Sequence, residues 1–443
     1  MNTPIYDFVK SYAAKSGVRF HMPGHKGKGP LGIEALDITE VAGADVLGEA
    51  CGIIGESEQN ATELFGTGRT VFLTGGSTAA IQAMLALAML RYRTKEKTCI
   101  LAARNAHRAF LHGVALLDIP VCFMLPEDAE TVYSGVVSPE EVERAIQSAP
   151  IKPFAVYITS PSYLGEISDI SGISSVCKKH GLPLLVDNAH GAYLAFLSPS
   201  LHPIHLGATM CADSAHKTLP VLTGGAYLHI AKGEEDNFRD VKNAVSLFSS
   251  TSPSYLALAS LDLANRAIAE GYAARIAQAS ELVQKTKQEL LNAGFHVLPT
   301  EPLKIVLGSA SAPFLADRLR GSGIECEFED QGHLVFMASA ENDPSDFEKL
   351  CNALLPLANE AEPSKLPPKP HLGEAVLSIR EALFAPREHV RVEDAIGRIY
   401  AELTASCPPA VPIAVCGERI DKETVKAFLH YGIKEVAVVK NKD

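Results

Sequence analysis

Short apolar runs alternate with helical patterns through the first two thirds of the chain. The apolar runs cover residues 71–74, 98–101, 155–159, 184–187 and 226–230. The helical patterns between several of them cover residues 79–90, 139–147 and 173–180. Buried strands appear in sequence as short continuous apolar runs, and strands that alternate with helices form crossover units. The pattern therefore predicts an α/β domain with a mainly parallel sheet.

A second region follows a long helical pattern from about residue 268 to 293. There, apolar runs at 304–307 and 333–337 and a helix from about 346 to 355 predict a small α+β unit. The proline-rich stretch 363–370 predicts a linker. After it we expect a helix that begins at Asp421 and a strand at 435–439.

The first residues, up to about Gly43, are rich in Gly, Pro and His, and we expect an arm or loop there. These expectations divide the chain into an N-terminal arm (1–44), a large domain (45–285) and a C-terminal small-domain region (286–443).

Composition limits the classes of function that fit this chain of 443 residues. Asp and Glu (52) outnumber Lys and Arg (40), giving a formal charge of -12, which argues against nucleic acid or anionic membranes as partners. The start shows no signal peptide, and the apolar stretch 79–90 is too short to span a bilayer. Nine cysteines without a Cys-x-x-Cys pair predict reduced thiols in a cytoplasmic protein and no metal site.

Residues 75–78, Gly-Gly-Ser-Thr, lie between an expected strand and an expected helix. Glycines allow a ligand close to the backbone, and a helix start offers free N–H groups and a positive dipole to an anion. A phosphate fits here, although an ordinary glycine-rich turn with a Ser or Thr cap explains the motif as well.

Asp187 ends an apolar run, and ligands of open α/β sheets bind beyond the carboxyl ends of strands. A carboxylate there can pair with a protonated pyridine nitrogen, although a capping Asp after a strand is the simpler alternative. Lys217 follows another apolar stretch, and a desolvated lysine can attack an aldehyde as a free amine. Taken alone it is a surface lysine. A phosphate cradle, a strand-end Asp and a later Ser-x-His-Lys together supply three contacts of one cofactor.

His107 comes just after the strand expected at 98–101, where its ring can stack on a bound ring; a capping or surface histidine is the alternative. With this residue the motifs form a set that resembles the ornithine/lysine/arginine decarboxylase family of pyridoxal-phosphate enzymes. The resemblance covers nearly the whole chain. Its motifs are Met22-Pro23-Gly24-His25-Lys26, Gly76-Ser77-Thr78, Asn105-Ala106-His107, Thr159-Ser160-Pro161-Ser162-Tyr163-Leu164-Gly165, Asp187-Asn188-Ala189-His190-Gly191, Ser214-Ala215-His216-Lys217-Thr218, Ser250-Thr251-Ser252-Pro253-Ser254-Tyr255, Phe384-Ala385-Pro386-Arg387-Glu388 and Gly397-Arg398-Ile399.

The resemblance implies an aspartate-aminotransferase-like (fold type I) large domain and a role for each site residue. Lys217 would carry pyridoxal 5'-phosphate as a Schiff base, His107 would stack on its ring, and Asp187 would pair with the pyridine nitrogen. His190 would lie near the phenolate side of the ring. The residues implied to hold the phosphate are Gly76, Ser77, Thr78 and Ser214. His216 would bind the phosphate as well or would help with proton transfer.

The family also implies an active site at a dimer interface. Ser250 or Thr251 would reach a partner's phosphate, and the arm around His25 would complete a neighbouring site. We therefore expect a homodimer or a higher homo-oligomer with shared active sites.

The chain is similar to the compact form of the family, without the additional N-terminal response-regulator-like domain of the large inducible members. It departs from the family pattern at residues 409–412, Pro-Ala-Val-Pro, and at residues 416–418, Cys-Gly-Glu. The family has Pro-Gly-Ile-Pro and Pro-Gly-Glu there. These changes bear on local loop geometry and substrate preference more than on the cofactor.

The reaction implied by the resemblance is decarboxylation of a basic L-amino acid. Arginine is favoured and lysine and ornithine remain open; the products are CO2 and a di- or polyamine precursor. Lys217 or His216 would return a proton to Cα. An aminotransferase or another lyase of the same fold remains an alternative, as does an inactive cofactor-binding subunit that regulates a related enzyme.

Overall fold

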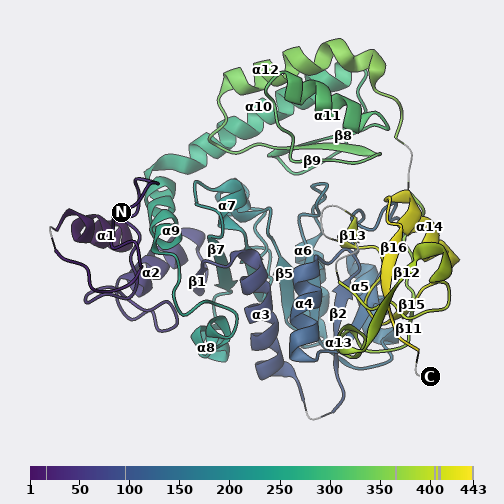
Figure 1. Ribbon diagram of the computed structural model, residues 1–443, viewed down its shortest axis with the longest axis horizontal. Coiled ribbons are helices and arrows are strands. Elements are labelled where there is room, and N and C mark those ends of the chain that lie inside the picture. Colours follow the sequence, from purple (N-terminus) through teal and green to yellow (C-terminus); the bar gives the residue numbers. More distant parts are fainter. Residues whose placement is uncertain (16, 95, 365–366, 404–405, 408–410, 442–443) are drawn as a thin grey trace. The chain divides into compact units, whose positions relative to one another are not determined.

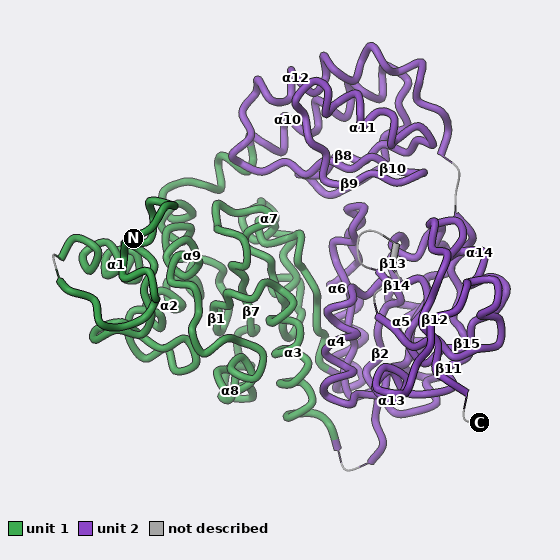
Figure 2. The backbone as a smooth tube through the Cα atoms, viewed as in Figure 1, with its two compact units in different colours: residues 1–93, 183–277 green, residues 94–182, 278–443 purple. Residues whose placement is uncertain are grey.

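Each of the two units of the chain combines segments that are far apart in sequence (Figure 2). Unit 1 contains residues 1–93 and 183–277, and unit 2 contains residues 94–182 and 278–443. The computed structural model describes residues 1–15, 17–94, 96–364, 367–403, 406–407 and 411–441. Parts of the expected linker (365–366) and of the 409–412 motif lie outside the described residues.

The strands of unit 1 lie in the order β1 (Arg69–Leu73), β7 (Ala226–Ile230), β6 (Met210–Asp213) and β5 (Leu184–Asp187). Strands β5 and β6 are parallel, whereas β7 runs antiparallel to both β6 and β1. Strands β1, β5 and β7 are labelled in Figure 1. Every residue of β5, β6 and β7 is buried, as expected for continuous apolar runs. Because β5 and β6 are parallel, the residues that follow them meet at the same edge of the sheet.

The helices of unit 1 pack around this sheet. They are α1 (Pro4–Ala14), α2 (Ile53–Phe65), α3 (Gly76–Tyr92), α7 (Ala215–Thr218), α8 (Val241–Ser246) and α9 (Tyr255–Ala267). Helix α3 is buried from Ala79 to Ala88 except at Gln82, and it contacts β6 and β7. Its Ala- and Leu-rich sequence gives it high helix propensity and a small cross-section for packing. These buried contacts hold α3 against the sheet, with its first turn close to the carboxyl ends of β1 and β6.

Unit 2 contains three parallel strands in the order β4 (Pro153–Thr159), β2 (Cys99–Ala103) and β3 (Val121–Met124). Its helices near these strands are α4 (Arg108–Leu117), α5 (Pro139–Ser148) and α6 (Ile170–Lys179). Helix α5 begins with a capping box, in which the Ser138 side chain accepts from the Glu141 backbone and the Glu141 side chain accepts from the Ser138 backbone.

The later part of unit 2 has its own small antiparallel sheet, β8 (Lys304–Gly308), β10 (His333–Met337) and β9 (Phe328–Glu329). Its helices are α11 (Ala312–Gly321) and α12 (Pro344–Leu354), preceded by the long α10 (Ala273–Asn292). Buried Ile, Leu, Val and Phe side chains from these elements form one core cluster.

The last part of unit 2 contains α13 (Ile379–Phe384), β12 (Arg387–Arg391), α14 (Lys422–His430) and β16 (Glu435–Val439). Strands β12 and β16 pair antiparallel along their full length. Two-residue strands form two further pairs, β11 (Glu374–Ala375) with β15 (Glu418–Arg419) and β13 (Ser406–Cys407) with β14 (Val411–Pro412).

The predicted α/β architecture with a mainly parallel sheet is confirmed, and two local expectations are wrong. The N-terminal arm contains the helix α1, whose Ile5 and Val9 are buried one turn apart. The helix expected from 268 to 293 is interrupted, because Gly271 has a φ of +106° and ends the regular backbone before α10. The helix α2 and the strand β3 were not predicted from the sequence pattern.

Candidate active site

A lysine and a histidine from adjacent strand ends meet in unit 1. Lys217 lies in the short helix α7, which follows β6, and His190 lies in the turn that follows β5. The Lys217 Nζ atom is 2.8 Å from the His190 Nε2 atom. His190 is buried, whereas Lys217 is exposed. The parallel pairing of β5 with β6 therefore places an accessible amine beside a buried imidazole.

The turn after β5 also carries a buried carboxylate. Asp187 is 2% exposed, and its Oδ1 atom accepts a hydrogen bond of 3.1 Å from the Ala189 backbone N–H. This bond holds the carboxylate at the end of the strand, and its role in binding a ligand stays a prediction.

A side-chain contact links the turn after β5 to the end of β6. The Asn188 Nδ2 atom donates to Asp213 Oδ1 at 2.7 Å, between residues 25 positions apart in sequence. The contact joins residues that are far apart in sequence, so no local motif predicts it. The signal that was present is a carboxylate, Asp213, that closes an otherwise apolar buried strand.

The predicted phosphate cradle brings two of its hydroxyl groups together. Ser214 Oγ donates to Ser77 Oγ at 2.8 Å, so the first turn of α3 lies against the end of β6. No side chain caps the N-terminus of α3, and Gly76 has a φ of +70°, a conformation that favours glycine. Uncapped helix N–H groups with neighbouring hydroxyls are a suitable donor set for a phosphate.

A glycine carbonyl fixes the start of α3. The Gly76 N–H donates to the Gly224 carbonyl at 2.8 Å. Gly225, the next residue, accepts from the His216 side chain: Nδ1 lies 3.0 Å from its carbonyl oxygen. Because a carbonyl only accepts, His216 carries its proton on Nδ1 and presents Nε2 as a lone pair.

The roles of the remaining predicted residues stay predictions. His107, in unit 2, is the N-cap of α4, and its Nδ1 accepts from the Ala109 N–H at 3.1 Å. Thr78 and Thr251 are exposed in unit 1. His25, in the arm, has its Nε2 atom 3.2 Å from Asp37 Oδ2.

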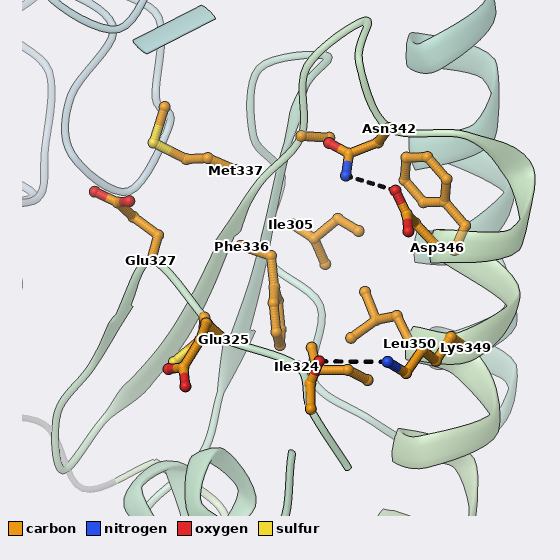
Figure 3. Close-up of a pocket in the computed structure, with 14 residues that line it drawn as sticks. Ile305, Ile324, Glu325, Glu327, Phe336, Met337, Asn342, Asp346, Lys349 and Leu350 are labelled. Atoms are coloured by element: carbon orange, nitrogen blue, oxygen red, sulfur yellow. Dashed lines mark hydrogen bonds between the residues drawn. The ribbon is translucent and has the colours of Figure 1, made fainter. Parts of the chain in front are cut away.

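A pocket of about 430 Å³ lies in unit 2 and contains none of the predicted cofactor residues (Figure 3). It is lined by the strands β8 and β10 and the helix α12. In it Asn342 Nδ2 donates to Asp346 Oδ2 at 3.0 Å, and Lys349 Nζ donates to the Gly323 carbonyl at 3.3 Å.

Among the described residues, no helix combines the length and the apolar character needed to cross a membrane. Eight cysteines of the described residues are free thiols: Cys51, Cys99, Cys122, Cys177, Cys211, Cys326, Cys351 and Cys416.

Two family models match the chain. The model described as Orn/Lys/Arg decarboxylase, major domain, matches residues 3–309, and the model described as Orn/Lys/Arg decarboxylase, C-terminal domain, matches residues 375–436. The domain boundaries predicted at residues 44 and 285 stay predictions.

Bacterial relatives align over nearly the full length of the chain. An uncharacterized protein of Bacillus subtilis (strain 168) is 29% identical over 96% of this chain and 93% of its own length. Arginine decarboxylases are similar to the same extent: that of Halalkalibacterium halodurans is 29% identical over 96% of this chain and 92% of its own length. That of Bacillus subtilis (strain 168) is 28% identical over the same shares.

Solved structures show the same fold. The constitutive lysine decarboxylase of E. coli has a TM-score of 0.81 at 17% identity, covering 99% of this chain and 82% of its own. Serine palmitoyltransferase of Sphingomonas wittichii has a TM-score of 0.58 at 15% identity, covering 81% of this chain and 84% of its own.

Proposed function

The chain belongs to the Orn/Lys/Arg decarboxylase family, and from that premise we propose that it removes the α-carboxylate of a basic L-amino acid with pyridoxal 5'-phosphate held on Lys217. Arginine is the substrate we favour, because relatives named arginine decarboxylase align with 96% of the chain. The products are CO2 and the corresponding amine, a di- or polyamine precursor. The contact between Lys217 and His190 carries the proposal, since it puts a nucleophilic amine at the ligand-binding edge of the sheet.

The residues present in unit 1 fit this cofactor. The uncapped N-terminus of α3, with Ser77 and Ser214 at hydrogen-bonding distance from each other, suits a phosphate. The buried carboxylate of Asp187 suits a protonated pyridine nitrogen, because a charge in a water-excluded site interacts strongly with its partner. Lys217 supplies the amine.

Lys217 must lose a proton before it acts as a nucleophile. With a lone pair on Nε2, His190 accepts that proton across the 2.8 Å contact and leaves the neutral amine.

When bound, pyridoxal phosphate supplies the electron sink for the electron pair of the broken bond between Cα and the carboxylate carbon. Asp187 would hold a proton on the pyridine nitrogen by its negative charge. After CO2 leaves, Lys217 would return a proton to Cα, or His216 would do so once its Nε2 atom, left open by the bond from Nδ1 to Gly225, has taken up a proton from solvent.

We propose that the active enzyme is a cytoplasmic homodimer or higher homo-oligomer. His107 would stack on the cofactor ring, and Thr251 would reach the phosphate of a partner subunit. The exposure of Thr251 and of Ser250 is consistent with a contact to another subunit.

The test is an assay of the purified protein with pyridoxal phosphate and, separately, arginine, lysine and ornithine. We expect stoichiometric CO2 and amine, with arginine the best substrate. Lys217→Ala should lower turnover by about 10²-fold or more. Lys179→Ala is the matched control, because Lys179 is an exposed lysine paired with Glu143 on α5 and should leave turnover unchanged.

Two results would contradict the proposal. Turnover that requires a keto acid and releases no CO2 would identify an aminotransferase. Cofactor absorbance without turnover of any basic amino acid would identify an inactive, regulatory member.

A further inference from the structure

A fully buried carboxylate lies behind the candidate active site. Asp213, the last residue of β6, is 0% exposed, as are the four side chains that contact it. Its Oδ2 atom is 3.0 Å from His202 Nε2 and 3.2 Å from His229 Nε2. Its Oδ1 atom accepts from Asn188 Nδ2 at 2.7 Å and from Cys211 Sγ at 3.5 Å.

Proton positions in this cluster follow from its outer contacts. His229 Nδ1 lies 2.8 Å from Thr70 Oγ1, which in turn lies 2.7 Å from Thr67 Oγ1. Because an ionised carboxylate only accepts, His229 carries its proton on Nε2 toward Asp213, and Thr70 donates to the lone pair on Nδ1. The His202 Nε2–H donates to the same oxygen. Four donors thus meet the four lone-pair positions of one carboxylate.

This set of donors keeps Asp213 ionised. Burial alone would raise the pKa of Asp213, but the two histidines outweigh that effect and hold the pKa well below its usual value. Burial lowers the pKa of His229, which favours its neutral ring, and the Asp213 carboxylate opposes that effect.

The carboxylate lies between two turns that carry the proposed cofactor residues. Asp213 immediately precedes Ser214, and its partner Asn188 immediately follows Asp187. The Asn188 backbone N–H also donates to the Ala212 carbonyl at 2.9 Å, so a main-chain bond and a charge-assisted side-chain bond join the two turns. The contact between Lys217 and His190 spans the same two turns.

We propose that Asp213 is a positioning residue, whose buried carboxylate holds the turn of Asp187 and His190 against the turn of Ser214 and Lys217. This inference rests on the proposed function. Asp213 touches no reacting atom and acts through Asn188. It fixes the spacing between Asp187, proposed to bind the pyridine nitrogen, and the turn that carries Ser214 and Lys217, proposed to bind the phosphate and the aldehyde.

Asp213 and three of its neighbours, His202, Cys211 and His229, are of types that bind a transition metal, and their ligand atoms lie within 4.8 Å of one another. The structure favours the hydrogen-bonded arrangement, because every lone-pair position of Asp213 already has a donor. His202 Nδ1 has no hydrogen-bond partner, whereas a metal-bound histidine ordinarily donates its second ring N–H.

The test compares Asp213→Asn with Thr70→Val. Asparagine keeps the volume of Asp213 and removes its charge, and the two rings can switch tautomers to satisfy it. Thr70→Val removes the hydroxyl on the far side of His229 and touches neither turn. The readouts are thermal stability without cofactor, the dissociation constant of pyridoxal phosphate, and the pH midpoint of the visible absorbance of the lysine-bound cofactor.

We expect Asp213→Asn to raise the dissociation constant of pyridoxal phosphate about tenfold or more and to move the pH midpoint of the absorbance. Thr70→Val should lower thermal stability but leave the dissociation constant within about twofold of wild type. Asn188→Ala, which removes only one of the four donors, should reproduce the loss of affinity if Asp213→Asn does not fold. When Asp213→Asn and Asn188→Ala are combined, their losses of cofactor affinity should not add, because both changes act through the bond between Asn188 and Asp213.

Wild-type affinity and pH midpoint in both Asp213→Asn and Asn188→Ala would overturn the inference while leaving the proposed function intact. A stoichiometric metal in the purified protein, lost in Asp213→Asn, would overturn it in favour of a metal site. Absence of any Lys217-dependent absorbance in the wild type would overturn the proposed function and this inference with it.

Discussion

Gly224 offers a direct test of how the candidate phosphate site is built. Its φ is +95°, and a Cβ atom added there would lie 2.8 Å from the Thr74 carbonyl oxygen. Its own carbonyl accepts the N–H of Gly76, which begins α3. The change Gly224→Ala therefore forces the backbone to move at the point that holds the start of this helix.

The magnitude follows from two contributions. A non-glycine residue in the left-handed region lowers the free energy of unfolding by roughly 1–2 kcal/mol. Alanine offsets ~0.4–1 kcal/mol of this loss, because it has less conformational entropy than glycine in the unfolded chain. Relieving the close contact with a backbone oxygen adds about 1–3 kcal/mol. Gly233 is the matched control, because its φ is +86° and nothing lies within 4 Å of an added Cβ.

Urea denaturation without cofactor measures both variants, and titration with pyridoxal phosphate measures the site. We expect Gly224→Ala to lose about 1–3 kcal/mol more of the free energy of unfolding than Gly233→Ala. We also expect only Gly224→Ala to bind the cofactor more weakly. Equal losses of stability and equal affinity in the two variants would refute this account of the cradle.

Three further changes test other parts of the structure. The pKa of His229 is lowered by folding, so as the pH falls the unfolded chain takes up a proton on this residue before the folded chain does. The free energy of unfolding should therefore fall as the pH drops below about 6.5. In denaturation curves measured at several pH values, His229→Gln should make the free energy of unfolding depend less on pH. Asp262 accepts from two backbone N–H groups at the start of α1, so Asp262→Ala should cost about 1–3 kcal/mol and speed hydrogen exchange in α1; unchanged exchange there would contradict this. Arg104 donates from both terminal nitrogens to consecutive backbone carbonyls of the 411–413 segment, so Arg104→Lys should cost about 1.5–3 kcal/mol in urea denaturation, whereas a loss below ~0.5 kcal/mol would argue against the bidentate contact.

The parts of the fold that sequence predicted well are those set by local pattern. The run at 184–187 became β5 with the same bounds, because a continuous apolar run that ends in a charged residue matches a buried strand and its exit. Strand direction is not local: nothing in the run at 226–230 indicates that β7 is antiparallel to its neighbours.

The two wrong expectations have physical causes. The glycines and prolines around residues 23–30 favour a loop, but they say nothing about the residues before them. Ile5 and Val9 are spaced for one face of a helix that begins at Pro4. The long helical pattern from 268 concealed Gly271, whose effect depends on a backbone angle that composition alone does not give.

The candidate site shows the same division between local and long-range information. The motif around Lys217 is contiguous, so it was found from sequence, and its contact with His190 follows from the parallel pairing of β5 and β6. The cluster around Asp213 was not found, because His202 and His229 lie 11 and 16 residues from it, and each has an ordinary role when considered alone. Only the folded chain shows that they donate to one oxygen.

The central claim is that Lys217 holds the cofactor, and trapping the bound state tests it most directly. The protein is incubated with pyridoxal phosphate, reduced with borohydride to make the lysine linkage permanent, digested, and mapped by mass spectrometry. We predict a single modified peptide that contains residues 214–218, with the added mass on Lys217. Modification of another lysine at comparable yield, or none above that of the unreduced control, would contradict the account.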